Sequence, residues 1–519
     1  MPLKLLQQTT QEKQKESDVA VIKRIDPYRK MSRKEKKKIK SLVRRAKFQR
    51  KIADSAQRTI AYRTMERSGL CQVDERIFTK TLEFGDVNYR LAKNEDKEAI
   101  FNGWCKLLNS FDPSLTVQFS FINQRLDHEL FEENITFLPQ ADGLDLYRNE
   151  YTNILHEKLE NGNNGLVKRK FVTFGMESES REAAKLKLDR VENELLTAFQ
   201  QTLHASAERC NGYQRLELLH DIYNIGTDRK LNFNWNMIAD TGLNTKDFIA
   251  PQCFEFKEKG HFGLEKQVGR VSYLQISASE LSDDMLSELL DMDSPQIITL
   301  HLQPVDRSKS LKQVKDILSN IQEMKITEQM KANRSGYDMD ILPPDLVDFE
   351  NEAQGMLDNL QARDERMFMV TFLVMQFADT PEELENRWFV ASQICQKYSC
   401  ELNPLYYQQE AGLMASSPIG VNPVRIQRGL TTASAAIFIP FQTQELYMKH
   451  GHYYGVNAVS GNMILIDRKA ADNLGGLFLG KAGSGKSFAT KREILNAFLA
   501  TTDDILINDP EREVRHEVA

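Results

Sequence analysis

Residues 475–499 read GGLFLGKAGSGKSFATKREILNAFL, and this stretch decides how the end of the chain is interpreted. Its segment GKAGSGKS, residues 480–487, matches the pattern G-x-x-x-x-G-K-[ST] without a mismatch. A short apolar run, Leu477–Leu479, precedes the segment, and apolar residues at helical spacing follow it. The order strand, glycine-rich turn, helix is the context in which this pattern binds phosphate groups. The stretch therefore predicts a nucleotide-binding loop (P-loop).

Each residue type in this loop has a physical role in phosphate binding. Glycines let backbone N–H groups close around phosphate oxygens, and the N-terminus of the following helix adds partial positive charge. Lys486 is expected to reach the β- and γ-phosphates, and Ser487 to hold the Mg²⁺ ion that accompanies the nucleotide. ATP and Mg²⁺ are the expected ligands. The predicted site consists of eight consecutive residues, Gly480, Lys481, Ala482, Gly483, Ser484, Gly485, Lys486 and Ser487.

The hydrolytic part of the predicted site is less complete. A P-loop ATPase core needs further strands, one of which carries an acid that helps hold Mg²⁺ and orient water. Only 32 residues follow Ser487, so we expect an incomplete α/β P-loop (RecA-like) domain. The run ILINDPE at 505–511 offers Asp509 as a stand-in for that acid and Glu511 as a base that activates water. The other interpretation, a strand end with a solvent-facing acidic turn, is favoured because the run follows the first helix directly.

Composition and cysteine usage are those of a soluble protein. Of the 519 residues, 41% are hydrophobic and 27% charged, and the net charge of −6 predicts no general attraction to nucleic acid. Six scattered cysteines without a C-x-x-C pair suit reduced thiols in the cytoplasm rather than disulfides or a zinc site. His450-Gly451-His452 lacks a third ligand, so a loop or strand edge is expected there. No apolar run approaches the roughly 20 residues of a membrane span, and no signal peptide is recognisable, so we expect a cytoplasmic protein.

The segment 1–52 is expected to be a basic, polar, partly helical tail. Between Arg29 and Lys51 there are thirteen Lys or Arg residues and one acid, Glu35. Such a segment is either a solvated helix or one attracted to anionic lipid headgroups or nucleic acid phosphates. Because no aromatic residues are interleaved for base stacking, solvation or peripheral contact with the inner face of the membrane through 29–51 is favoured. Direct DNA binding stays open.

Residues 53–453 alternate strand and helix patterns without a strict repeat, which predicts an α+β domain. Ile77–Phe84 alternates like a half-buried strand, and Met367–Ala378 predicts a central strand buried on both faces. Thr380, followed by Pro381 and Glu383, predicts a helix start. Other expected elements are helices at 94–109, 178–208, 309–333 and up to 363, strands at 115–122, 171–174 and 433–441, and a strand–helix–strand unit over 272–302.

A hairpin is expected where the nucleotide domain, residues 454–519, begins. The runs 454–459 and 463–467 flank Ser460-Gly461-Asn462, a sequence typical of tight turns. This hairpin would lead directly into the strand before the P-loop.

Several stretches, in this order, resemble the large conjugation ATPases that energise type IV secretion, above all those of Gram-positive integrative conjugative elements. The stretches are SGLCQVDERIFTKTLEFGDVNYRLAKNEDK at 68–97, RGLTTASAAIFIPF at 428–441, HGHYYGVNAVSGNMILIDR at 450–468 and GKAGSGKS at 480–487. Asp509-Pro510-Glu511 is similar to the acidic element that follows the family's second core strand. The resemblance covers about residues 53–511.

The resemblance implies a domain that docks to type IV secretion channel subunits, followed by the start of a RecA-like motor. By this resemblance, the chain is an ATP-binding subunit that energises DNA or protein transfer or channel assembly. Intact relatives are expected to form homo-oligomers. The family's later acidic strand, catalytic glutamate and arginine finger have no counterpart here, so we expect a truncated form in which hydrolysis and a stable hexamer are doubtful.

Two other functions remain open at this stage. One is a non-hydrolysing scaffold or docking protein whose partial P-loop domain is inert. The other is a DNA-pumping motor of a different secretion or division class, against which the long α+β region before the loop argues.

Overall fold

The computed structural model describes residues 55–508, apart from 126–134, 161–165, 228, 277–281, 336–343, 363–364, 443–447, 449–450, 458–462, 471–473, 482 and 502. The chain divides into two units, residues 1–59 and 60–519. In the first unit only the short helix α3 (Ala56–Thr59) and Ser55 are described. The basic segment 29–51 lies outside the described residues.

The first half of the main sheet has a β-α-β-β-α-β order. Its strands lie side by side in the order β6, β3, β5, β4, and every neighbouring pair is antiparallel. This arrangement is the split β-α-β, or ferredoxin-like, topology. The elements are β3 (Ile77–Phe84), α4 (Asn94–Ser110), β4 (Leu115–Arg125), β5 (Leu166–Glu177), α7 (Arg181–Thr202) and β6 (Ala207–Arg209).

The second half repeats the same topology. Its strands lie in the order β12, β9, β11, β10, again antiparallel throughout. The elements are β9 (Gln267–Ile276), α11 (Asp284–Leu290), β10 (Gln296–Val305), β11 (Met367–Ala378), α14 (Pro381–Lys397) and β12 (Cys400–Pro404). The sequence shows no strict repeat, so the duplication is visible only in the strand order.

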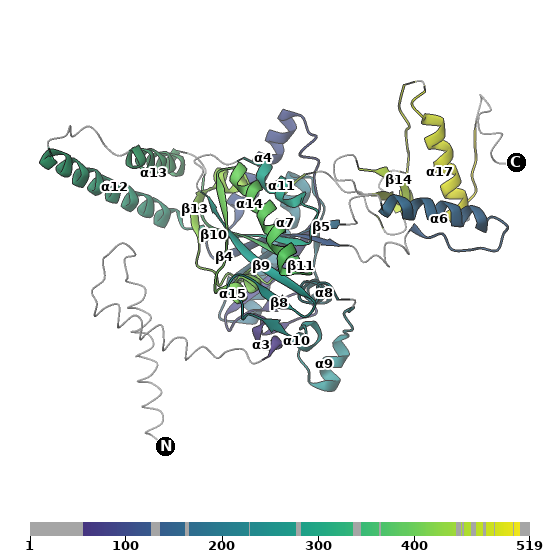
Figure 1. The fold of residues 1–519 in the computed structure, drawn as a ribbon, viewed down its shortest axis with the longest axis horizontal. Helices are drawn as coiled ribbons and strands as arrows, with labels where there is room; N and C mark the ends of the chain where they lie inside the picture. The colour runs from purple at the N-terminus through teal and green to yellow at the C-terminus, as the bar shows by residue number, and fades with distance from the viewer. Residues whose placement is uncertain are drawn as a thin grey trace, which may run out of the picture. The chain divides into compact units, whose positions relative to one another are not determined.

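The two halves join edge to edge through their equivalent strands, β4 and β10. These strands pair antiparallel from Gln296↔Asn123 to Leu302↔Val117. The four helices of the two halves, α4, α7, α11 and α14, cover one face of the resulting sheet (Figure 1), and their apolar side chains share one core with the strands. Trp104 of α4 and Phe119 of β4, with ring centroids 5.0 Å apart, lie at its centre.

The other face of the sheet is covered by a second core that includes α8 (Gly212–Tyr223), α10 (Thr245–Ile249) and α15 (Gln409–Ser416). A row of buried polar side chains crosses this face and binds the segment 415–426, here called the strap. Gln118 Nε2 donates to the Ser417 carbonyl (2.8 Å), and His301 Nε2 donates to the Ala415 carbonyl (2.8 Å). Thr79 Oγ1 donates to the Ile419 carbonyl (2.9 Å), and Thr371 Oγ1 donates to the Ile426 carbonyl (2.7 Å). Buried carbonyls outside regular structure need such donors.

Each half carries an insertion in the same hairpin connection, between its second and third strands. The first insertion, between β4 and β5, contains α6 (Asp145–Glu160). The second, between β10 and β11, contains α12 (Arg307–Ser335) and α13 (Pro344–Ala362), which pack together through their own apolar core. Arg307 Nη2 donates to the Leu360 carbonyl oxygen (3.2 Å), and Lys325 pairs with Glu350, so the two helices run antiparallel.

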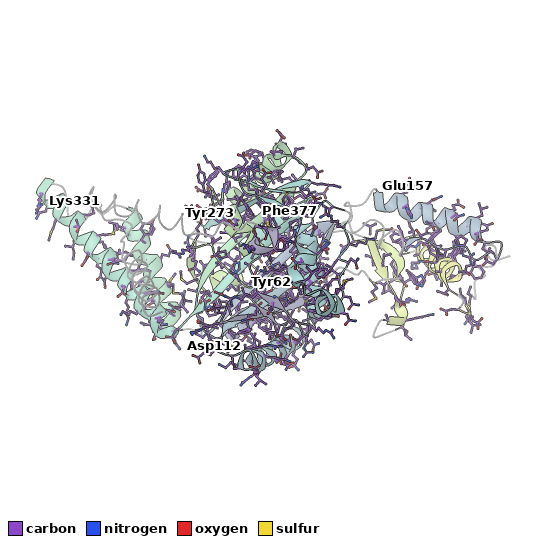
Figure 2. The ribbon with its side chains drawn as sticks, turned by 90° about the horizontal axis from the view of Figure 1, so that it is seen from below. Tyr62, Asp112, Glu157, Tyr273, Lys331 and Phe377 are labelled. Carbon is purple, nitrogen blue, oxygen red and sulfur yellow. The ribbon has the colours of Figure 1, made fainter. Side chains whose placement is uncertain are left out.

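Short elements complete the described chain. They are β1 (Thr64–Met65), β2 (Cys71–Gln72), α9 (Trp235–Thr241), β7 (Phe254–Glu255), β8 (Phe262–Leu264), β13 (Arg428–Thr431), α16 (Thr432–Ala436), β14 (His452–Val456), β15 (Met463–Ile466), the 3-10 helix η1 (Arg468–Ala470) and α17 (Lys486–Ala500). Figure 2 shows how densely side chains fill the body of the sheet and its helices, where Phe377 and Tyr62 are labelled and only 0% and 2% exposed.

Most of the strands and helices predicted for 53–453 are present in a mixed α/β structure with a large antiparallel sheet. Met367–Ala378 forms β11, paired with β9 and β10, and Thr380 accepts a hydrogen bond from Glu383 N (3.2 Å) as the N-cap of α14. The strand predicted at 433–441 is wrong. Thr431 caps the short helix α16 there, and Phe438, Ile439 and Phe441 are buried in the core without strand pairing.

Candidate nucleotide-binding site

The segment 480–487 leads into α17, a helix of 15 residues whose first two residues are Lys486 and Ser487. Gly483 and Gly485 have φ angles of +77° and +85°, a region that side-chain-bearing residues rarely adopt. A Cβ atom on Gly480 would lie 2.4 Å from Ser484 Oγ, so a side chain there would require the Ser484 side chain to move. The loop and the helix N-terminus thus have the arrangement in which backbone N–H groups and the helix dipole attract an anion. Ala482 lies outside the described residues.

Lys486 contacts the loop from the first turn of α17. Its Nζ atom donates hydrogen bonds to the carbonyl oxygens of Gly480 (3.0 Å) and Lys481 (3.1 Å). Ser487 is exposed on the same turn. The ammonium group of Lys486 therefore already lies at the loop. A bound phosphate would compete with the two loop carbonyls for the N–H donors of this group.

A hairpin packs along the face of α17 that carries Glu493 and Asn496. Strands β14 and β15 pair antiparallel, with a bulge between Tyr453 and Gly455. Tyr454 donates its hydroxyl to Glu493 of α17 (2.8 Å), and burial together with that carboxylate raises the pKa of Tyr454 to about 12. His452 Nδ1 lies 3.3 Å from Oδ1 of Asn496, which is buried on the same helix face. The predicted hairpin is confirmed, although its turn, 458–462, is not described.

Helix α6 of the first insertion packs against the same hairpin and helix. Its residues Tyr151 and Leu155 share a small core with Met463 and Leu465 of β15 and Leu499 of α17. We call α6, the hairpin, and α17 with the loop before it (480–485) together the nucleotide module. The predicted boundary at residue 453 did not anticipate this packing, because nothing local in residues 135–160 indicates which distant segment they contact.

The strand predicted before the loop is absent from the described residues. Leu477–Leu479 has no regular secondary structure and pairs with no described strand, and Leu477 and Leu479 are 81% and 82% exposed. The segment 505–508 is likewise unpaired, with Leu506 97% exposed. An apolar run becomes a parallel strand only when neighbouring strands take up its backbone hydrogen bonds, and the described residues around it supply none. Asp509 and Glu511 lie outside the described residues.

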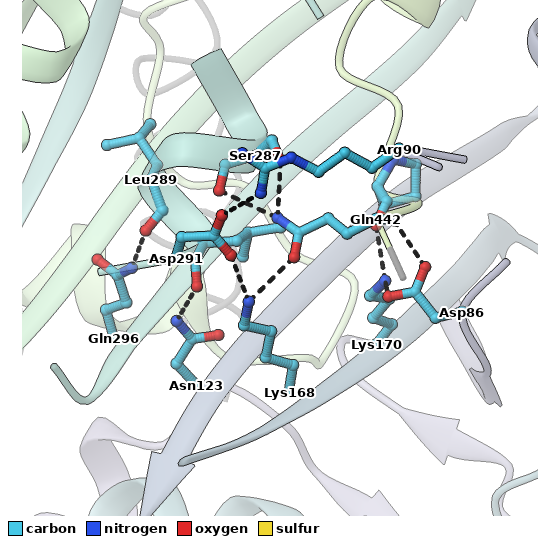
Figure 3. Close-up of polar contacts among 12 residues, drawn as sticks. Asp86, Arg90, Asn123, Lys168, Lys170, Ser287, Leu289, Asp291, Gln296 and Gln442 are labelled. Carbon is cyan, nitrogen blue, oxygen red and sulfur yellow. Dashed lines mark hydrogen bonds and ion pairs between the residues drawn. The ribbon is translucent and has the colours of Figure 1, made fainter. Parts of the chain in front are cut away.

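A polar network fixes the point where the chain leaves the sheet toward the module (Figure 3). Gln442 receives a hydrogen bond from Lys168 Nζ at Oε1 (3.0 Å) and donates from Nε2 to the Ser287 carbonyl (3.0 Å). Its backbone N–H donates to Asp86 (2.8 Å). Lys168, near the start of β5, also pairs with Asp291 (2.6 Å). The chain therefore returns from the first insertion and departs after Gln442 at adjacent positions on the sheet.

Other candidate chemistry is sparse in the described part of the chain. No group of three or more His, Cys, Asp or Glu side chains there is placed to hold a metal ion. No helix in the described ranges is long and apolar enough to cross a membrane. His450, half of the histidine pair, is not described.

Comparisons with known proteins add no family to these observations. No family model matches the chain, and no curated protein matches it either. The resemblance to conjugation ATPases therefore rests on the quoted stretches of sequence alone.

Proposed function

We propose that the chain binds ATP with Mg²⁺ at the segment 480–487 as a subunit of a conjugative type IV secretion machine. The observation that carries the proposal is the full G-x-x-x-x-G-K-S pattern at the N-terminus of α17, with glycines at positive φ where the loop turns. Lys486 would neutralise the β- and γ-phosphates, and Ser487 would contribute to the Mg²⁺ ion. The secretion role and the channel-subunit partners rest on the resemblance, and a location at the inner face of the membrane rests on the basic segment 29–51.

A non-hydrolysing docking or scaffold role is the second candidate. It is favoured by one observation: Leu477–Leu479 and 505–508 form no strand pairs among the described residues, whereas hydrolysis requires an acid held on a core strand beside the loop. In this alternative the ferredoxin-like sheet and its insertions contact the secretion channel, and nucleotide binding is absent or has no catalytic consequence.

Equilibrium titration of the full chain with ATP and Mg²⁺ tests the proposal. Lys486→Ala is expected to weaken binding by two orders of magnitude or more, because it removes the only lysine in the pattern that approaches the loop carbonyls. Lys491→Ala, a matched change of charge further along α17, is expected to bind as the unaltered chain does. Equal binding by both variants, or no binding at millimolar nucleotide, would leave the scaffold function as the better account.

A further inference from the structure

Arg148 of α6 connects the first insertion directly to the P-loop helix. The side chain is only 1% exposed, and its Nε atom donates to the carbonyl oxygen of Leu499 (3.0 Å), one residue before the end of α17. The last carbonyls of a helix have no partner within the helix, and a cation there is stabilised by the helix dipole. Arg148 therefore caps the end of α17 opposite the end that carries Lys486.

Two aspartates hold this arginine in place. Asp142 accepts hydrogen bonds from both terminal nitrogens, Nη1 and Nη2, at 2.6 Å each, and Asp145 accepts one from Nη1 at 2.8 Å. The hydrogen bonds from Arg148 hold the pKa of Asp142 well below its usual range. Asp145 also accepts from the backbone N–H groups of Gln140 and Ala141, so the start of α6 is fixed to the same cluster. The guanidinium is thus oriented toward Leu499 before any nucleotide binds.

The apolar side of α6 contacts the same region. Tyr151 and Leu155 pack with Leu499, whose carbonyl Arg148 caps, and with Met463 and Leu465 of the hairpin. Residues 135–160 are therefore structurally part of the nucleotide module, although both ends of their insertion are strands of the sheet, β4 and β5. Helix α6 thereby contacts one end of a helix about 22 Å long whose other end begins at the loop 480–487.

We infer that Arg148 is a positioning residue for the nucleotide site: it fixes the C-terminal end of α17 against α6 and so couples the first insertion to the P-loop. The effect of Arg148 on nucleotide binding rests on the proposed function, whereas its role in fixing the end of α17 does not. If the coupling exists, it is reciprocal, so nucleotide at the loop also stabilises α6. A role confined to packing would stabilise the module without responding to nucleotide.

The test combines ATP·Mg²⁺ titration with amide hydrogen exchange on the full chain. Arg148→Ala is expected to weaken ATP binding about tenfold, within the usual range of coupling between sites. Arg148→Lys keeps the charge but offers three donors on one nitrogen, against the four hydrogen bonds that Arg148 makes from three nitrogens, so an intermediate loss is expected. Arg190→Ala, at an exposed arginine paired with Glu194 on α7, is the control and should bind unchanged. In the unaltered chain, ATP·Mg²⁺ should slow exchange in α6, and Arg148→Ala should abolish that protection.

The outcomes separate this inference from the proposed function. Normal ATP affinity in Arg148→Ala, or nucleotide that leaves exchange in α6 unchanged, would overturn the inference while the proposed function stands. No ATP binding by the unaltered chain would overturn the proposed function. In that case exchange without nucleotide decides the structural part: faster exchange over 486–501 in Arg148→Ala and Arg148→Lys supports it, and unchanged exchange contradicts it. Asp142→Asn, which keeps Arg148, guards against misfolding of the alanine variant and should show a smaller effect in the same direction.

Discussion

The ferredoxin-like sheet and the segment before the loop 480–487 both contain an apolar run, yet only the run in the sheet forms a strand. Met367–Ala378 is paired on both sides and nearly all buried as β11, whereas Leu477–Leu479 pairs with no described strand, and Leu477 and Leu479 are largely exposed. The difference shows that an apolar run forms a buried strand only where neighbouring strands pair with its backbone and neighbouring side chains cover it.

The largest difference is expected between two leucines. Leu300 of β10 is 1% exposed, and Leu300→Ala should lower the free energy of unfolding by about 2–5 kcal/mol, through lost burial and the cavity that remains. Leu506, 97% exposed, should tolerate the same change within about 0.5 kcal/mol. Urea unfolding of both variants measures the two effects. A cost above 1 kcal/mol for Leu506→Ala would show that this segment is packed, contrary to the comparison.

The buried polar row predicts an acid-sensitive sheet. Burial lowers the pKa of His301 from 6.5 to about 4, so the folded protein keeps the ring neutral while the unfolded chain takes up a proton. Stability is therefore complete above pH 6.5 and falls as the pH drops toward 4, by roughly 3 kcal/mol in all. Urea unfolding at several pH values measures this loss. His301→Gln, which keeps a donor for the Ala415 carbonyl, should flatten the profile, and an unchanged profile would assign the acid sensitivity to other groups.

A smaller difference is expected between two glycines. Gly420 of the strap has φ +87°, and a Cβ there would lie 2.8 Å from Thr79 Cγ2. Gly420→Ala should cost about 1–3 kcal/mol from backbone strain and crowding against the sheet. Gly483 of the loop has φ +77° with open space around it, so Gly483→Ala should cost only about 1 kcal/mol of strain. Thermal unfolding compares them, and an equal cost would mean that the strap can move away from Thr79.

Local sequence patterns predicted the elements of the sheet well. Alternation placed β3 at Ile77–Phe84, and Thr380-Pro381 placed the start of α14, because each signal acts within a few residues. The duplication was not predictable, since equivalent strands share a place in the topology rather than a sequence. The strand expected at 433–441 failed because the run begins inside the helix that Thr431 caps, and its remaining apolar residues are buried by packing without strand partners.

The candidate site was predictable in part for the same reason. The loop chemistry of 480–487 is encoded by consecutive residues, and the structure places them at the start of α17. Arg148, which caps the other end of that helix, lies 351 positions away in sequence from Leu499. In a single sequence nothing marks such a pair, because the arginine looks like any other charged residue of a polar helix. Likewise, only the structure shows that Asp142 and Asp145 both accept hydrogen bonds from Arg148.

The central claim is that nucleotide binds in the module and not on the sheet, and amide hydrogen exchange with and without ATP·Mg²⁺ tests it most directly. The account predicts slower exchange over 480–490, with smaller protection in α6, and no change in β9–β12 of the second half. Protection absent from 480–490, or found in the second half of the sheet instead, would contradict it.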